Sequence, residues 1–117
     1  MTITRDIKLK TKKITPKLIN YITDKIVQNI NPEKVLLFGS YARGEANSDS
    51  DLDIFIIHNT NRSNRDLRRK VDRLLLGRRF PVEIIVRTTS EVEANLRDNN
   101  PFYTHHIFKD GRILYEQ

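Results

Sequence analysis

The stretch LLFGSYARGEANSDSDLDIFII, from Leu36 to Ile57, determines which fold and which site this sequence predicts. Two strongly apolar runs enclose a Gly-Ser pair and three aspartates, Asp49, Asp51 and Asp53. Charged side chains are costly beside buried strands unless they have a partner. We therefore expect the two acids that begin the second strand, Asp51 and Asp53, to serve a chemical function at its end.

Helix-like and strand-like segments alternate on both sides of this stretch, which predicts a layered α/β domain. The strand that begins at Asp51 is apolar on both faces from Ile54 onward, which is typical of a central strand. The expected elements are a helix from Pro16 to Ile30 capped by Thr15, a strand over Lys34–Gly39, a short helix closed by Gly44, a strand over Asp51–His58, a helix from Arg65 to Gly77, a strand over Phe80–Arg87, a helix opened by a Ser90/Glu93 capping box and interrupted at Asn100-Pro101, and a last strand ending near Glu116.

Length, composition and charge limit the classes of protein that this chain can belong to. Its 117 residues fit one domain, and the absence of cysteine argues against a small secreted disulfide scaffold. No apolar run is long enough for a signal peptide or a membrane span. We expect a soluble, cytoplasmic protein without membrane contact, whose net charge of +6 suits a nucleotide or an acidic partner.

Asp51 and Asp53 are two residues apart in the expected strand, so both side chains point to one face, about 7 Å apart along the chain. Carboxylates that close repel each other and one pKa rises, unless a cation lies between them. Magnesium prefers oxygen ligands and is typically held by one or two carboxylates together with substrate phosphates. The pair therefore predicts a metal–phosphate site.

Gly39 and Ser40 follow the preceding strand and open a short helix. Glycine allows a ligand to approach the backbone closely. N–H groups at a helix start attract anions, and the serine hydroxyl adds a further donor. We expect this pair to bind phosphates beside the acids.

Glu83 is the third acid of interest, because it lies between Val82 and Ile84 in an expected core strand, a poor place for an unpaired charge. In a metal site it could ligate a second ion or accept the proton of an attacking hydroxyl. The alternative is a salt bridge to one of the many arginines.

The segments GSYARG, from Gly39 to Gly44, and SDSDLD, from Ser48 to Asp53, resemble the minimal nucleotidyltransferase family of the DNA polymerase β-like superfamily. The resemblance extends from about Ile14 to Tyr115. It implies a single-domain nucleotidyltransferase fold over residues 1–117 (core about 14–115), of α/β (α+β) class, with a small mixed β-sheet flanked by helices.

The resemblance also implies roles for individual residues. Glu83 stands where the family has aspartate, so its carboxylate lies one methylene further from the backbone. Gly39, Ser40 and Arg43 would bind the nucleotide, while Asp51, Asp53 and Glu83 would be catalytic and would bind magnesium, as one or two ions, with ATP as the substrate.

Members of this family often pair with an all-helical HEPN-type toxin, and some transfer AMP from ATP to a toxin tyrosine. The resemblance therefore implies an antitoxin that transfers a nucleoside monophosphate, AMP from MgATP, to a hydroxyl of its partner protein. One domain of this size has no part dedicated to a small substrate or a template, which favours modification of a protein over polymerisation or antibiotic inactivation, so nucleic acid is not expected as a direct substrate. Neutralisation by binding and occlusion, without catalysis, is the alternative.

Other acidic and histidine patterns have simpler interpretations. Asp49 lies in NSDSD, a sequence typical of a turn. An EF-hand loop starting there would need Gly and Glu where Ile54 and Thr60 stand, so calcium is not expected. His105 and His106 are adjacent, so on a helix they would point in different directions and chelate one metal poorly.

The helix after residue 64 and its flanks are rich in cations. They could form a solvated face opposite the core leucines or a docking surface for an acidic partner or RNA. No aromatic residues are interleaved with them, so sequence-specific RNA recognition is not expected. The cluster comprises Arg62, Arg65, Arg68, Arg69, Lys70, Arg73, Arg78 and Arg79.

Overall fold

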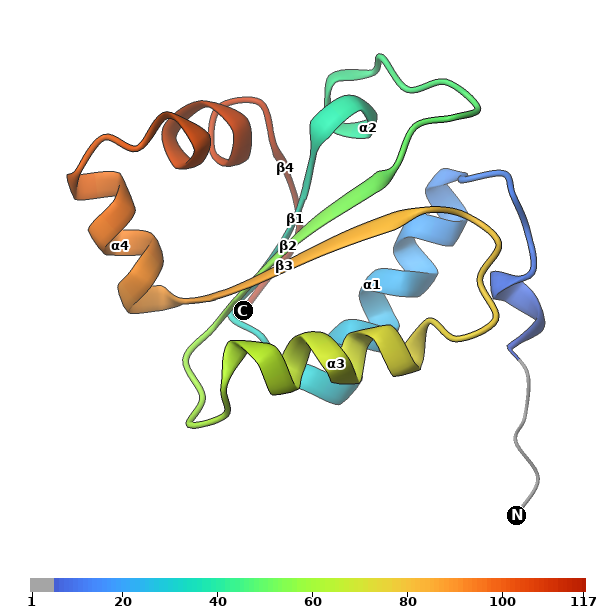
Figure 1. Cartoon of the computed structure of the whole chain (residues 1–117), viewed down its shortest axis with the longest axis horizontal. Helices are drawn as coiled ribbons and strands as arrows, with labels where there is room; N and C mark the ends of the chain where they lie inside the picture. The colour runs from blue at the N-terminus through green and yellow to red at the C-terminus, as the bar shows by residue number, and fades with distance from the viewer. Residues whose placement is uncertain (1–5) are drawn as a thin grey trace.

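The computed structural model describes residues 6–117 as a four-stranded sheet with helices on both sides (Figure 1). The strand order is β3-β2-β1-β4, with β1 antiparallel to β2 and β4, and β2 parallel to β3. The sheet is therefore mixed and β2 is central, as predicted. The elements are η1 (Ile7–Leu9), α1 (Pro16–Ile30), β1 (Lys34–Phe38), α2 (Gly39–Arg43), β2 (Leu52–His58), α3 (Asn64–Leu74), β3 (Val82–Thr88), α4 (Thr89–Arg97), η2 (Phe102–Ile107) and β4 (Arg112–Glu116).

The larger core lies on the side of the sheet covered by α1 and α3, which we call the helical face (Figure 1). Alternation along the strands sends every second side chain to this side. The strands contribute Val35, Leu37, Leu52, Ile54 and Ile56. Leu9 of η1 is buried in the same core.

The opposite side of the sheet is covered by α4 and η2 and carries a smaller, aromatic core (Figure 1). Phe38 and Phe55 pack edge-on with ring centroids 6.3 Å apart. Because alternate residues share a side, Asp53 and Glu83 belong to this side too. We call it the acidic face.

Helix α1 forms as its sequence predicts. Thr15 caps it by accepting a hydrogen bond from the Leu18 N–H, and Asn31 ends it in the left-handed conformation. Its buried stripe, at residues 18, 19, 22, 26 and 30, packs on the helical face. Neither α1 nor any other helix within residues 6–117 combines the length and the apolar character that crossing a membrane requires.

The prediction of a Ser90/Glu93 capping box was wrong, because α4 begins at Thr89, before Ser90. The box that forms joins Thr88 and Glu91, with both reciprocal hydrogen bonds present. Thr88 is the last residue of β3 and keeps an extended backbone, which a helix N-cap requires. The other boundaries differ from prediction by a few residues: β2 starts at Leu52 rather than Asp51, β3 covers 82–88 rather than 80–87, and α3 ends at Leu74 rather than Gly77.

His58 is fully buried at the end of β2 and joins three elements. Its ring nitrogens lie 2.9 Å from Thr60 Oγ1 and 2.7 Å from Asn64 Oδ1. The Asn64 amide in turn donates to Glu91 Oε1, at the start of α4. This network fixes the starts of α3 and α4 relative to the sheet.

Candidate active site

Gly39 lies directly against the Asp53 carboxylate. β1 ends at Phe38 and the chain turns at once into α2, with Gly39 at φ 74°. Glycine adopts this left-handed conformation without steric cost. A Cβ atom on Gly39 would overlap Asp53 Oδ2 and lie 3.0 Å from its Cγ. Only glycine therefore allows the Gly39-Ser40 pair and Asp53 to meet.

Strand register brings the second carboxylate to the same point. Phe38 of β1 lies opposite Asp53, and Asp53 lies opposite Glu83 of β3. Asp53 is thus between the end of β1 and Glu83. This convergence joins segments distant in sequence, and only the motif around Gly39 indicated it beforehand.

Asp51 is exposed and directly precedes β2, so the prediction that it lies within the strand was wrong. It still lies close enough to Asp53 for its negative charge to raise the pKa of that carboxyl. Asp49 lies in a turn, as predicted, where its N–H bonds Asn47 Oδ1.

The pKa of Asp53 is raised to about 7. Burial is the largest cause, followed by a hydrogen bond with Glu83 and by the negative charges of Glu83 and Asp51, whereas Arg43 lowers the pKa. Near neutral pH a proton therefore stabilises this group of carboxylates. A hard divalent cation, which prefers oxygen ligands, would relieve the same repulsion.

Glu83 is exposed, so its carboxylate does not lie in the core, although its position between Val82 and Ile84 on an expected core strand suggested burial. β3 is at the edge of the sheet, and Val82 and Ile84 point to the opposite side. Within residues 6–117, no three carboxylate or histidine side chains form a ready metal-binding group. Magnesium commonly takes only one or two carboxylates and completes its shell with phosphates and water, and Asp51 and Asp53 fit that mode.

The N-cap residue of α2, Phe38, makes no side-chain capping bond, so that residue leaves the first-turn N–H groups uncapped. Arg43, at the end of α2, is exposed, and its Nε donates to Glu45 Oε2 at 3.1 Å. Exposed ion pairs contribute about 0–1 kcal/mol, so Arg43 could leave Glu45 for a phosphate at small cost.

His105 and His106 lie outside this site. Both are exposed in η2. The ring of His106 packs edge-on against Phe102, with centroids 5.8 Å apart. The two histidines therefore lie at the surface of the aromatic core, away from the candidate site.

Known structures share the fold. A structure described as a "putative nucleotidyltransferase" from Sulfolobus solfataricus aligns over 86% of this chain and 79% of its own, with a TM-score of 0.57 and 24% identity. A structure described as a toxin–antitoxin with AMP-PNP aligns over 84% of this chain and 73% of its own, with a TM-score of 0.52 and 20% identity. Both likenesses establish the fold.

Sequence comparison identifies the family. A relative from Methanocaldococcus jannaschii, named "putative protein adenylyltransferase", is 31% identical over 110 residues, which cover 92% of this chain and 100% of the relative. Residues 20–117 match the family described as polymerase beta, nucleotidyltransferase. The chain, with its glycine-serine pair packed against convergent carboxylates, therefore belongs to the polymerase β-like nucleotidyltransferase family.

Proposed function

We propose that this nucleotidyltransferase transfers AMP from MgATP to a hydroxyl of a partner protein: the hydroxyl oxygen bonds to the α-phosphorus, the bond to the β-phosphate breaks, and pyrophosphate leaves. The observation that carries the proposal is the contact of Gly39 with Asp53, continued across the register to Glu83. It brings a candidate phosphate-binding pair and candidate metal ligands together on one face of the sheet. The family supports nucleotidyl transfer, and the relative named protein adenylyltransferase supports AMP and a protein acceptor.

Each residue has a role that its position permits. The backbone N–H groups and hydroxyl of the Gly39-Ser40 pair would bind the triphosphate, and Arg43 would add a cation near it. Asp51 and Asp53 would hold magnesium together with phosphate oxygens. When bound, the metal supplies charge neutralisation at the attacking and leaving oxygens.

Glu83 would accept the proton of the attacking hydroxyl. Its side chain is exposed at the sheet edge, on the residue that lies opposite Asp53 in the register, so an acceptor from outside can reach it. A general base must be within hydrogen-bond reach of the proton that it takes. The longer glutamate side chain extends this reach by one methylene relative to aspartate. Ligation of a second ion is its alternative role.

The partner that we propose is an all-helical HEPN-type toxin, with this chain as the antitoxin. Support comes from the fold shared with a toxin–antitoxin structure. The partner would supply the acceptor hydroxyl. Neutralisation by occlusion alone remains the competing function, since it requires the complex but neither metal nor nucleotide.

Intact-mass spectrometry tests the proposal directly. The chain is mixed with the helical protein of the neighbouring reading frame and MgATP, and the partner should gain the mass of one or more AMP units. Asp53→Ala should stop the transfer, whereas Asp49→Ala, which removes a carboxylate from the nearby turn, should leave it intact. An unmodified partner whose toxicity is still blocked would favour occlusion instead.

A further inference from the structure

The outer edge of β3 has no neighbouring strand in the part of the chain that the structure describes. The Leu52 N–H bonds the Pro81 carbonyl, and alternate residues of a parallel ladder turn their backbone groups to the same side. The N–H and C=O groups of Ile84 and Val86 therefore point outward. An edge of this kind can pair with an extended segment of another chain.

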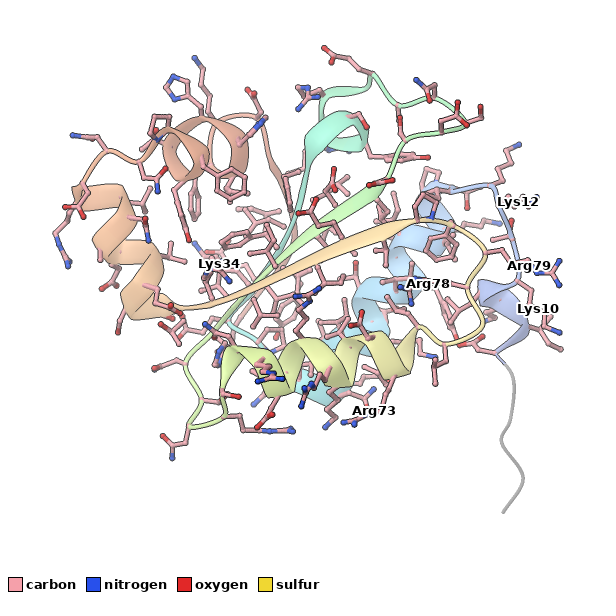
Figure 2. The ribbon with its side chains drawn as sticks, viewed as in Figure 1. Lys10, Lys12, Lys34, Arg73, Arg78 and Arg79 are labelled. Carbon is pink, nitrogen blue, oxygen red and sulfur yellow. The ribbon has the colours of Figure 1, made fainter. Side chains whose placement is uncertain are left out.

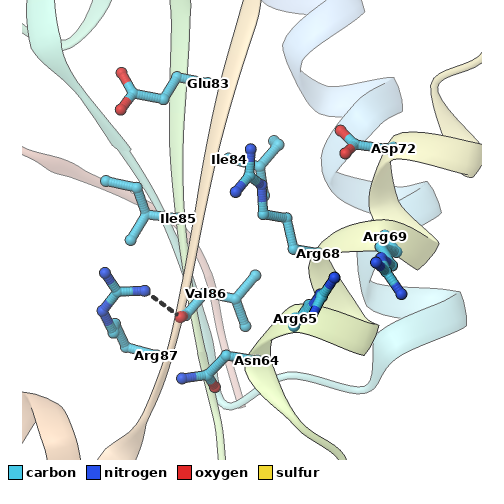
Figure 3. Close-up of a pocket in the computed structure, with 10 residues that line it drawn as sticks. All are labelled: Asn64, Arg65, Arg68, Arg69, Asp72, Glu83, Ile84, Ile85, Val86 and Arg87. Carbon is cyan, nitrogen blue, oxygen red and sulfur yellow. Dashed lines mark hydrogen bonds between the residues drawn. The ribbon is translucent and has the colours of Figure 1, made fainter.

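A groove of about 660 Å³ runs between this edge and α3 (Figure 3). Ile84 and Val86 point from β3 toward α3 and form an apolar wall. Arg87 lies on the strand itself, with its guanidinium donating to the Val86 carbonyl at 2.7 Å (Figure 3). The remaining wall comes from α3 and is mainly cationic: it contains Arg65, Arg68 and Arg69.

The three arginines of α3 are poorly neutralised within the protein. Their i, i+3, i+4 spacing places them on one face of the helix, and all three are exposed. Within residues 6–117, none of them has an acidic partner within 4.0 Å. Among the groove residues on α3, Asp72 is the one acid, and it forms no ion pair within 4.0 Å with these arginines. The groove therefore suits an anionic ligand.

Glu83 connects the groove to the candidate active site. It lines the groove and also lies opposite Asp53 in the register. Arg87 is four residues further along β3, or about 13 Å at the rise of an extended strand. A segment laid along this edge would therefore reach the carboxylates at one end and the arginines at the other.

We propose that this groove binds an acidic, extended segment of the protein that accepts AMP, paired with the β3 edge and with its hydroxyl beside Glu83. The inference rests on the proposed function for the identity of the acceptor. The carboxylates of the segment would lie two to four residues from the acceptor, opposite Arg65, Arg68 and Arg87. Peptide is favoured over RNA because the edge offers backbone hydrogen bonds and no aromatic side chain lines the groove for base stacking.

Fluorescence anisotropy tests the binding without requiring catalysis. The probe is a labelled peptide of about twelve residues, long enough to cover β3 with flanks, containing one tyrosine and alternating glutamate and threonine. Arg65→Glu/Arg68→Glu should weaken its binding at low salt at least about tenfold. The matched control is Lys10→Glu/Arg79→Glu, which changes the net charge equally at exposed positions away from the groove (Figure 2). Its affinity should stay within about twofold of the wild type.

A second probe tests pairing with the strand edge and leaves the protein unchanged. The same peptide, N-methylated at alternate residues, has lost the backbone donors that pair with β3. It should bind at least about tenfold more weakly. Equal affinity of both peptides would overturn edge pairing, and equal losses in the two double variants would overturn the groove as the binding site.

Two further measurements separate the alternatives. Calorimetric titration should give the same ATP affinity for the wild type and Arg65→Glu/Arg68→Glu, since neither arginine belongs to the nucleotide site. A single-stranded RNA of equal net charge that displaces the peptide more strongly than the unlabelled peptide itself would overturn the peptide in favour of nucleic acid. Peptide binding without AMP transfer to any tyrosine would support the groove while contradicting the proposed function.

Discussion

The helical face and the acidic face are built from neighbouring residues of the same strands, yet their contents are opposite. In β2, Leu52, Ile54 and Ile56 are fully buried on the helical face. Asp53, between the first two of them, points to the acidic face beside Gly39 and Glu83. A strand can present both surfaces because its side chains alternate.

The sheet therefore separates the larger apolar core from the carboxylates of the candidate site. The helical face has two long helices and a large continuous core. The acidic face has a smaller aromatic core and keeps carboxylates that repel one another. The apolar burial on the helical face can therefore offset the repulsion between carboxylates on the acidic face. Substitutions on the helical face should mainly lower stability, and substitutions at the carboxylates of the acidic face should mainly lower activity.

Ile54→Ala should have the largest effect on stability. It removes buried methylenes from the helical face, and we expect the unfolding free energy to fall by about 2–5 kcal/mol. Ile85→Ala, on a half-buried acidic-face position of the adjacent strand, should cost about 1 kcal/mol. Urea denaturation measures both, and equal losses would contradict the separation of the faces.

Gly39→Ala should damage activity more than stability. The new Cβ would displace the Asp53 carboxylate, and a displacement of about 1 Å in a reacting group can reduce the rate about 100-fold. The left-handed backbone adds about 1–2 kcal/mol of strain.

Gly44→Ala is the matched control for that variant. Gly44 has φ 73°, but its Cβ would meet nothing within 4 Å. It shares the backbone strain without the displaced carboxylate, so AMP transfer should fall only slightly. Equal activity losses in the two variants would mean that the contact with Asp53 is unimportant.

Asp53→Asn should stabilise the metal-free protein at high pH. The pKa of Asp53 is raised to about 7 in the folded state, by burial first and then by Glu83, whereas the unfolded value is about 4. Between these values the folded state binds more protons, so stability falls as pH rises from about 4 to about 7. Asparagine cannot ionise and removes this loss.

Thermal melts with a chelator check that prediction. Because Asp53 is only half-buried, solvent screening reduces the effect, and we expect a gain of about 1–2 kcal/mol, or roughly 5 °C, at pH 8. No gain is expected at pH 4, where the wild-type carboxyl is protonated. Magnesium should narrow the difference at pH 8, and a gain of equal size at both pH values would contradict the assignment.

Thr88→Ala should have the smallest effect, about 1 kcal/mol, because it removes one half of the α4 capping box. Ser90→Ala, at the position that the sequence indicated, should change little. The Thr88 backbone N–H lowers the pKa of Glu91, so the contribution of Glu91 is complete above its unfolded pKa of about 4.3. It is lost as pH falls through the lower folded value, which denaturation at pH 3 and pH 7 would detect.

The sequence was informative where the signal is local. Thr15, Pro16 and Asn31 fix the ends of α1 through caps that involve only neighbouring residues. The strand–glycine–acid motif from Leu36 to Ile57 likewise lies within one hairpin, so it predicted β1, α2, β2 and the family. The sequence analysis named only Ser90 and Glu93, but Thr88 and Glu91 satisfy the same capping pattern, so the local pattern alone does not identify the box that forms.

The remaining features depend on pairings between distant segments. That β3 is an edge strand, and hence that Glu83 is exposed, follows from the strand order, which no local pattern encodes. The face of α3 that meets the groove is likewise defined only by its position beside β3. The eight cations from Arg62 to Arg79 therefore look like one cluster in the sequence. Three of them, Arg65, Arg68 and Arg69, line the groove in the structure.

The contact between Gly39 and Asp53 also has a consequence for the order of folding. Both residues belong to one antiparallel hairpin and are fourteen positions apart, whereas Asp53 and Glu83 are thirty positions apart. Closing the shorter loop costs less chain entropy, and local contacts form faster than distant ones. The nascent chain would therefore bring Gly39 and Asp53 together early and add Glu83 only when β3 docks, so two residues of the candidate site would meet before the third.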